Sequence, residues 1–204
     1  MRASKVNTIE LPDFHIKLGS GFILFFALVY FFDDSGFISA LFPAVLMHEL
    51  GHILLIFLFG ASPTRLKATL SGFEIDYLGS LNDTKELIIA LSGPFWGLLF
   101  AFLCAKLGQL RNSDYLLLCA GLGFILNFFN LLPVLPLDGG RVLNLSLRAS
   151  FGEVKAEKLV GTVGKISAAL LLLSGLYFIA KGLGFALFIA GGWLLILQQN
   201  KSCK

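Results

Sequence analysis

Three ionisable side chains stand together inside a long apolar run of the sequence. His48 and His52 flank Glu49 in an H-E-x-x-H motif, and the run of residues 37–59 around them contains no other ionisable side chain. Residues four apart on a helix project from one face, so the two imidazoles could bind one zinc ion. Glu49 is then placed to act as general base on a zinc-bound water. The motif predicts metal-assisted hydrolysis.

These residues could instead be ordinary core side chains that neighbouring helices satisfy, because short motifs recur by chance. The apolar setting argues against that interpretation. An ionised side chain at bilayer depth costs about 2.5–3.5 kcal/mol even on insertion scales, and such groups are usually functional. Zinc binding gives the three of them one common explanation.

The elements that must hold these residues are transmembrane helices. Of the 204 residues, 56% are hydrophobic and only 14% are charged, whereas about a quarter are charged in a soluble domain. The apolar residues form blocks long enough to span a bilayer. The sequence predicts an all-α polytopic membrane protein with about six transmembrane helices. The net charge of +3 does not indicate nucleic-acid binding, because the basic residues lie beside the apolar blocks and fit membrane topology.

The expected organisation is a cytoplasmic tail (1–17), a single transmembrane domain (18–198) and a second cytoplasmic tail (199–204). Its spans are expected at about 18–32, 37–59, 87–107, 115–132, 166–180 and 183–198. Within residues 61–86, the stretches 65–70 and 73–78 alternate polar and apolar residues on either side of Ser71-Gly72, which predicts a small β-hairpin after the second span. The basic, amphipathic residues 141–165 are expected to be helical and cytoplasmic.

The basic residues predict how the chain lies in the membrane. With six spans and an inside N-terminus, 13 of the 16 Lys and Arg residues lie on one side, and Lys106, Arg111 and Lys181 lie on the other. Basic residues are enriched on the cytoplasmic side of membrane proteins. The sequence therefore predicts a multi-pass protein of the cell membrane with both termini in the cytosol.

Other residues that could do chemistry are not expected to. Cys104, Cys119 and Cys203 have no C-x-x-C spacing, so neither a disulfide framework nor a cysteine zinc site is predicted. A cleavable signal peptide is not expected, because the first apolar block starts late, near Leu18, and lacks a small-residue cleavage site. His15 is expected to be a surface histidine.

A catalytic zinc site needs a third protein ligand, and Asp138 is the best candidate. It closes a segment in which Pro133 and Pro136 stop the helix. At membrane depth, such backbone is tolerated only against protein or a wet cavity. Asp138 could instead cap a helix over residues 139–149. Taken alone, Asp138 fits the two roles about equally well; beside the H-E-x-x-H span, the ligand is favoured.

The two motifs together resemble the site-2 proteases, or M50 metallopeptidases. The first match is the H-E-x-x-H motif, and the second is Asn130-Leu-Leu-Pro133-Val-Leu-Pro136-Leu-Asp138-Gly139 within residues 127–140, an N-x-x-P-x-x-P-L-D-G segment. The resemblance covers roughly residues 20–150 and is strongest to the sporulation branch that processes a sigma-factor precursor. It implies one zinc ion per chain, held by His48, His52 and Asp138, with Glu49 activating water. It also implies that Asn130 contacts the substrate or the transition state.

The sequence departs from the family pattern in two ways. Ser92-Gly93-Pro94 corresponds to a G-P element, but Phe95-Trp96-Gly97 follows where the family often has an Asn. There is also no room for the cystathionine-synthase-like domain or the inserted PDZ domain of some members. Regulation by a bound nucleotide or by a PDZ gate is therefore not implied.

We therefore expect an intramembrane zinc metalloendopeptidase that cleaves membrane-spanning or membrane-associated proteins near the cytoplasmic face, as in regulated intramembrane proteolysis. Its expected partners are that substrate, the lipid bilayer and a membrane regulator, with no nucleic acid. One alternative is a catalytically silent membrane scaffold, against which the intact Glu49 argues. Another is a metal transporter, which should carry further acids or histidines along its spans; the third, fifth and sixth spans have none.

Overall fold

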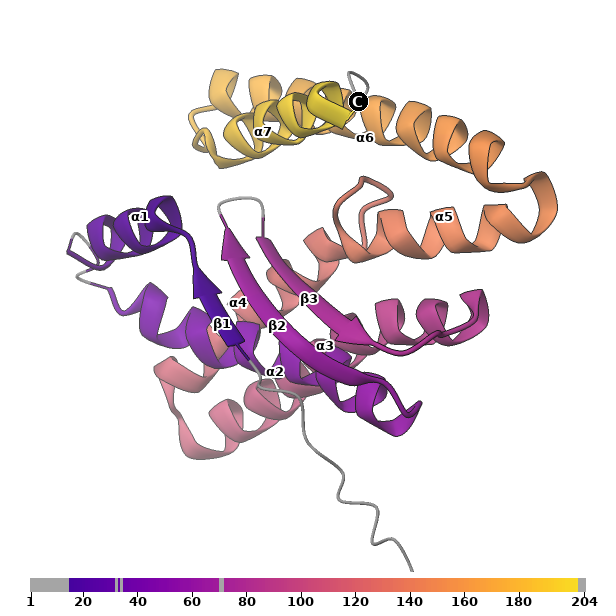
Figure 1. Ribbon diagram of the computed structural model, residues 1–204. Helices are drawn as coiled ribbons and strands as arrows, with labels where there is room; N and C mark the ends of the chain where they lie inside the picture. The colour runs from indigo at the N-terminus through magenta and orange to yellow at the C-terminus, as the bar shows by residue number, and fades with distance from the viewer. Residues whose placement is uncertain (1–14, 32, 34, 70–71, 202–204) are drawn as a thin grey trace, which may run out of the picture.

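Helices make up most of the protein, with one small sheet beside them (Figure 1). The computed structural model describes residues 15–31, 33, 35–69 and 72–201. In chain order the elements are β1 (His15–Leu18), α1 (Ser20–Phe31), α2 (Phe37–Leu58), β2 (Ser62–Thr69), β3 (Gly72–Leu78), α3 (Asp83–Arg111), α4 (Asp114–Asn130), α5 (Asp138–Phe151), α6 (Glu153–Ala180) and α7 (Ala186–Lys201). The expected helical architecture with a hairpin after the second apolar block is confirmed. The turn residue Ser71 and the ends 1–14 and 202–204 lie outside the described residues.

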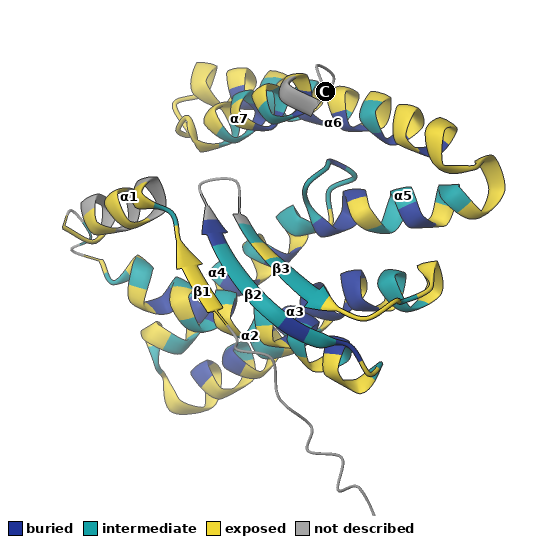
Figure 2. Cartoon of the chain, viewed as in Figure 1, coloured by how far each residue is buried: buried dark blue, intermediate teal, exposed yellow. Residues whose placement is uncertain are grey.

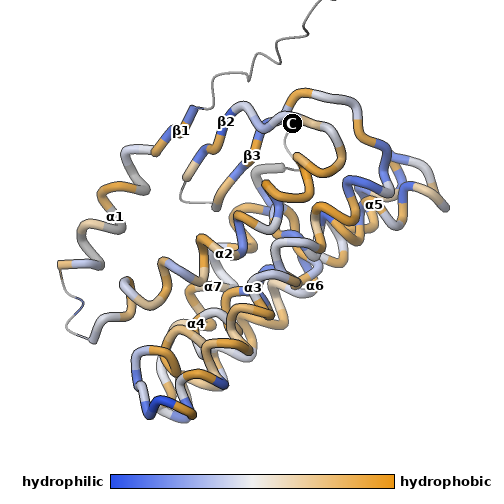
Figure 3. Tube along the Cα trace, turned by 90° about the horizontal axis from the view of Figure 1, so that it is seen from below, coloured by the Kyte–Doolittle hydropathy of each residue, from blue (hydrophilic) through white to orange (hydrophobic). Residues whose placement is uncertain are grey.

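Three helices are long and apolar enough to cross a membrane: α2, α3 and α6. The apolar helices α4 and α7 are shorter, and α1 has only 12 residues. At 1.5 Å per residue α1 is about 18 Å long, less than the roughly 30 Å of a bilayer's hydrocarbon core. By length and composition the described residues thus support three of the six expected spans. Hydrophobic residues dominate α2 and α3, whereas the sheet carries many hydrophilic residues (Figure 3).

The sheet has β2 at its centre. β3 pairs with β2 as the antiparallel partner of the expected hairpin, and β1 pairs with the other edge of β2 in parallel. The first strand was not predicted, because four residues are too few to show an alternating pattern. It extends the sheet into the region expected to be a polar tail, and the N–H of Gly19 adds a bond to the carbonyl of Ala68. Strand β1 therefore lies on the same side of the protein as the hairpin.

The helices α2, α3 and α4 form the packed centre of the protein, and their buried residues face one another (Figure 2). Small side chains permit this close packing. Ala44 of α2 is fully buried, and a Cβ added at Gly123 of α4 would lie 3.5 Å from the Cβ of Ala44 and 3.3 Å from the Cβ of Ala101 of α3. Close approach through small residues is typical of membrane helices, where apolar burial alone does not drive association.

The C-terminal part begins with the loop of residues 131–137, which connects α4 to α5. Gly152, at φ 76°, then separates α5 from α6, since a left-handed conformation favours glycine and ends a helix. The basic residues 141–165, expected to be helical, are therefore divided between two helices. α6 runs without a break into the fifth expected span. α6 and α7 pack along each other and lie over α5 (Figure 1).

Candidate metal centre

The two histidines of α2 and the aspartate that begins α5 converge at one point. His48 and His52 lie one turn apart and are both buried, and their Nε2 atoms are 3.3 Å apart. Oδ2 of Asp138 lies 3.1 Å from Nε2 of His48 and 3.3 Å from Nε2 of His52. The three residues form a buried group that could hold one metal ion. The structure therefore brings together the three residues that the sequence nominated.

The far side of the His48 ring contacts Asn127 of α4. Nδ1 of His48 lies 2.8 Å from Oδ1 of Asn127, and the amide nitrogen of Asn127 donates to the carbonyl of Gly123 at 2.6 Å. That second bond fixes which end of the amide faces the imidazole. Because Oδ1 can only accept, we assign the proton of neutral His48 to Nδ1. Its Nε2 lone pair is then free for a metal.

His52 is held in the same way by the backbone of α3. Its Nδ1 lies 2.8 Å from the carbonyl oxygen of Ile89, which also accepts from the hydroxyl of Ser92 at 2.6 Å. A carbonyl oxygen only accepts, so Nδ1 of neutral His52 carries the proton and Nε2 carries the lone pair. Metal-binding histidines usually donate their other ring N–H to such partners, which fix the ring orientation.

Three acceptor atoms thus face one another at the centre of the site. Two imidazole lone pairs and a carboxylate oxygen within 3.1–3.3 Å repel one another unless a cation lies among them. Zinc bonds of about 2.0–2.1 Å in a tetrahedral site place neighbouring ligand atoms roughly 3.3 Å apart. Three protein ligands would also leave a fourth position for water or substrate. The donor set and its spacing fit a catalytic zinc ion.

Two glycines of α3 make room for the site. A Cβ at Gly93 would lie 2.2 Å from Nε2 of His52, and one at Gly97 would lie 2.1 Å from Oδ1 of Asn127. Gly93 belongs to the predicted G-P element, and α3 continues through its proline. The close approach of α3 therefore leaves room for a metal-binding imidazole and for the amide that orients the other one.

Glu49 and Asn130 border the metal-ligand group. Glu49 is half-buried and interacts electrostatically with His48, His52, Asp138 and Arg141. The amide nitrogen of Asn130, at the end of α4, lies 3.5 Å from Nε2 of His48. The carboxylate and the amide that the sequence nominated for chemistry are thus both beside the predicted ligands.

Asp138 does not act as the helix cap that was the alternative interpretation. It lies in the first turn of α5, whose N-cap residue is Leu137, and the described contacts of its carboxylate go to the two histidines. Asn127 and the carbonyl of Ile89 were missed by sequence reasoning. A polar Asn inside an apolar span was a usable signal for the first, whereas a backbone carbonyl gives no signal in the sequence.

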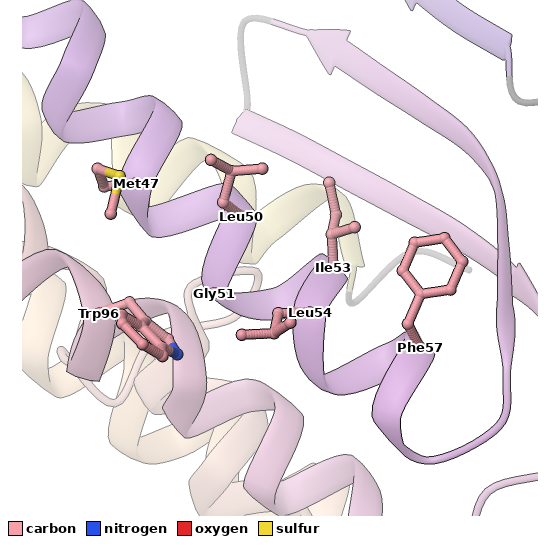
Figure 4. A pocket seen from close by; sticks show the side chains of 7 residues that line it. All are labelled: Met47, Leu50, Gly51, Ile53, Leu54, Phe57 and Trp96. Atoms are coloured by element: carbon pink, nitrogen blue, oxygen red, sulfur yellow. The ribbon is translucent and has the colours of Figure 1, made fainter.

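An apolar groove of about 290 Å³ lies on a different face of α2 (Figure 4). It is lined by Met47, Leu50, Gly51, Ile53, Leu54 and Phe57 of α2 and by Trp96 of α3. At 100° per residue, Leu50 and Leu54 point away from His48 and His52. The groove is therefore separate from the metal ligands.

Comparison with known proteins agrees with this site. The sequence model of peptidase family M50 matches residues 103–174, which include Asp138. The zinc metalloprotease MJ0392 of Methanocaldococcus jannaschii is 29% identical over 183 residues, 84% of this chain and 54% of its own length. The chain is thus similar to peptidase family M50. Rip3 of Mycobacterium tuberculosis, 30% identical over 182 residues, matches 84% of this chain and 45% of its own length.

The chain spans about half the length of these two relatives. A solved structure, a site-2 protease from Methanocaldococcus jannaschii, superposes with a TM-score of 0.69 at 24% identity, over 92% of this chain and 90% of that chain. The chain therefore has the fold of that site-2 protease. The closer resemblance to the sporulation branch stays a prediction.

Proposed function

We propose that the chain is an intramembrane zinc metalloendopeptidase that hydrolyses a membrane-spanning or membrane-associated protein near the cytoplasmic face. The observation that carries this proposal is the convergence of His48, His52 and Asp138 beside Glu49, on and against an apolar helix. A zinc ion bound there would polarise the scissile carbonyl. It would also lower the pKa of water enough for the water to lose a proton and attack the carbonyl at neutral pH.

The chain's own residues have separate roles in this proposal. His48, His52 and Asp138 hold the metal, and Asn127 and the Ile89 carbonyl orient the two rings. Glu49 takes a proton from the attacking water and returns it to the departing amine nitrogen. Asn130, whose amide nitrogen lies beside Nε2 of His48, donates a hydrogen bond to the substrate backbone.

The substrate must be unwound, because a helix keeps its peptide groups in its own hydrogen bonds. We propose that the unwound strand pairs with the outer edge of β3, since β1 already occupies the other edge of the hairpin. Ile75 and Tyr77 of β3 pack against the cluster that contains Ile56 and Ile89, and the carbonyl of Ile89 holds His52. This packing connects β3 to the ligand side of α2.

The proposed topology is a multi-pass protein of the cell membrane with both termini in the cytosol and one peptidase domain over residues 18–198. The distribution of Lys and Arg supports it. The pairing of β1 with β2 supports it too, because it keeps the start of the domain on the side of the hairpin. On this topology the metal site lies within the membrane, nearer the cytosol.

The alternative functions are less well supported. A silent scaffold would have no use for Glu49 beside three converging ligands. A transporter needs a path of ionisable groups through its spans, and the part of the chain that the structure describes holds no second metal-ligand group of this kind.

The test compares purified wild type with Glu49→Gln and with a His48→Ala/His52→Ala double variant, for metal content and for cleavage of a membrane-inserted test helix. We expect about one zinc per chain in wild type and Glu49→Gln, none in the double variant, and cleavage by wild type alone. Stoichiometric zinc in the double variant would refute the site. Loss of zinc in Glu49→Gln would make Glu49 a ligand and the proposed mechanism wrong.

A further inference from the structure

A buried amide lies near the end of the last helix, far along the chain from the predicted metal ligands. Gln198 of α7 is 3% exposed, in a helix that is otherwise largely apolar. Its Nε2 donates to the carbonyl oxygen of Leu135 at 2.5 Å. Leu135 lies three residues before Asp138, in the loop that carries the third ligand. The last helix is therefore bonded directly to the ligand loop.

The Leu135 carbonyl depends on this donor. In the described loop, the N–H of Val134 donates to Leu132 and the N–H of Leu137 donates to Val134, while Pro136 has no N–H to give. These backbone bonds leave the Leu135 oxygen to a side chain. Unpaired backbone groups are strongly disfavoured away from water, so the amide of Gln198 holds the loop at this point.

Apolar packing holds the same loop against the same two helices. Val134 of the loop, Ala168 of α6 and Leu194 of α7 form one buried cluster, and Leu132 and Leu137 pack against it. Leu137 is the N-cap residue of α5, directly before Asp138. The α6–α7 pair therefore contacts the loop through apolar side chains on both sides of Leu135, whose carbonyl accepts the hydrogen bond from Gln198.

α6 leaves space for the amide at Gly164. A Cβ at Gly164 would lie 3.2 Å from the amide carbon and nitrogen of Gln198, closer than most Cβ contacts, so a larger residue would crowd the amide. Gly161, on the same helix and one turn earlier, has no neighbour within 4 Å of its Cβ position in the part of the chain that the structure describes. The open space beside the amide is thus specific to one glycine.

We propose that Gln198 is a positioning residue for the metal centre: it fixes the ligand loop, and through the loop it sets where Asp138 meets the two histidines. This inference rests on the proposed zinc site. It assigns a role in the site to the α6–α7 pair, which supplies no ligand. Without the amide, the loop shifts, the carboxylate is displaced, and the metal leaves faster.

The test uses the purified full chain in detergent, loaded with Co²⁺, whose visible absorption reports the arrangement of its ligands. The key variant is Gln198→Leu, and the matched control is Gln199→Leu, which removes the same amide from an exposed neighbouring position. We expect Gln198→Leu to change the Co²⁺ spectrum and to lose metal to a chelator about tenfold faster. Gln199→Leu should match wild type in both measurements.

A purely structural role for Gln198 would lower the melting temperature and leave the spectrum unchanged. A folded Gln198→Leu with the wild-type spectrum and metal-loss rate would overturn the proposal. If Gln198→Leu does not fold, Gly164→Ala and Gly161→Ala test the proposal instead. Gly164→Ala should change both the Co²⁺ spectrum and the rate of metal loss, and Gly161→Ala should change neither. Wild-type behaviour of both variants would overturn the proposal. A wild type that binds no Co²⁺ refutes the proposed zinc site itself, a result distinct from unchanged variants of a metal-binding wild type.

Discussion

Asn127 and His48 form a hydrogen bond of 2.8 Å between the side-chain oxygen of one and Nδ1 of the other, across the interface of α4 and α2. Asn127 is fully buried, and its amide nitrogen is held by the carbonyl of Gly123. The orientation of the His48 nitrogen that would bind the metal therefore depends on Asn127, which is not one of the proposed ligands.

Replacing Asn127 should weaken metal binding without removing a ligand. Partners of this kind are worth about 10–100-fold in metal affinity, so we expect a loss in that range for Asn127→Leu, measured by competition with a chelator. Asn144→Leu is the matched control, because the side-chain oxygen of Asn144 is buried and has no hydrogen-bond partner among the described residues. Wild-type affinity in Asn127→Leu would show that the bond does not orient the ring.

A methyl group at Gly93 should empty the site. Its Cβ would lie 2.2 Å from Nε2 of His52, so we expect Gly93→Ala to bind no zinc and to cleave nothing. Alanine is otherwise about 1 kcal/mol better than glycine inside a helix, so helix propensity cannot account for such a loss. Gly121→Ala should keep both properties, because none of the described residues comes within 4 Å of the Cβ position of Gly121. Metal analysis of the two purified proteins checks this; a zinc-loaded Gly93→Ala would contradict the geometry.

Proline on the outer edge of β3 should slow cleavage, because it removes an N–H that could pair with substrate. Successive residues of a strand point their N–H groups to opposite sides, so one of Glu74→Pro and Ile75→Pro removes a bond to β2 and the other removes an N–H at the free edge. Because Ile75 also packs against the cluster of Ile56 and Ile89, Ile75→Ala measures what that packing contributes to the melting temperature, and the edge variant is the one that loses no more stability than this. Wild-type cleavage by that variant would refute substrate pairing at β3.

The products should be cut close to the cytoplasmic boundary of the substrate's membrane span, where helix-breaking residues should speed the reaction. Mass spectrometry of the product termini measures the position directly. Cuts confined to the extracytoplasmic third would make the proposed topology wrong.

Acid should weaken the start of α2 through Asp33. Its carboxylate accepts the N–H groups of Ile38 at 2.8 Å and Phe37 at 3.0 Å, and the bond from Ile38 is the largest cause that lowers the pKa of this group. Because the pKa of Asp33 is lower in the folded than in the unfolded protein, the carboxylate stabilises the fold at pH values above its unfolded-state pKa. This stabilisation is lost as the pH falls through the folded-state pKa. Melting temperatures of wild type and Asp33→Asn should therefore converge below about pH 4. A gap that stays constant with pH would rule out the carboxylate as its source.

The three residues that converge in the structure could be nominated from the sequence because their signals are local: the spacing of His48 and His52 is a property of one helix, and Asp138 lies in a distinctive proline-rich segment. Asn130 was nominated only because its segment resembles the second motif of the site-2 proteases. Asn127 was missed because its role depends on how α4 packs against α2. Strand β1 was missed because its partner, β2, lies more than one helix away along the chain.

The residues of the site come from segments far apart in the sequence, so the ribosome makes them at different times. The ribosome makes the two histidines within one turn of α2, but Asp138 follows only after the whole of α3 and α4. A nascent chain that has inserted α2 alone carries two imidazoles and a glutamate without their aspartate. On the proposed function, metal capture by all three ligands is therefore a late event in biogenesis, and a chain that ends before Asp138 would hold only part of the site.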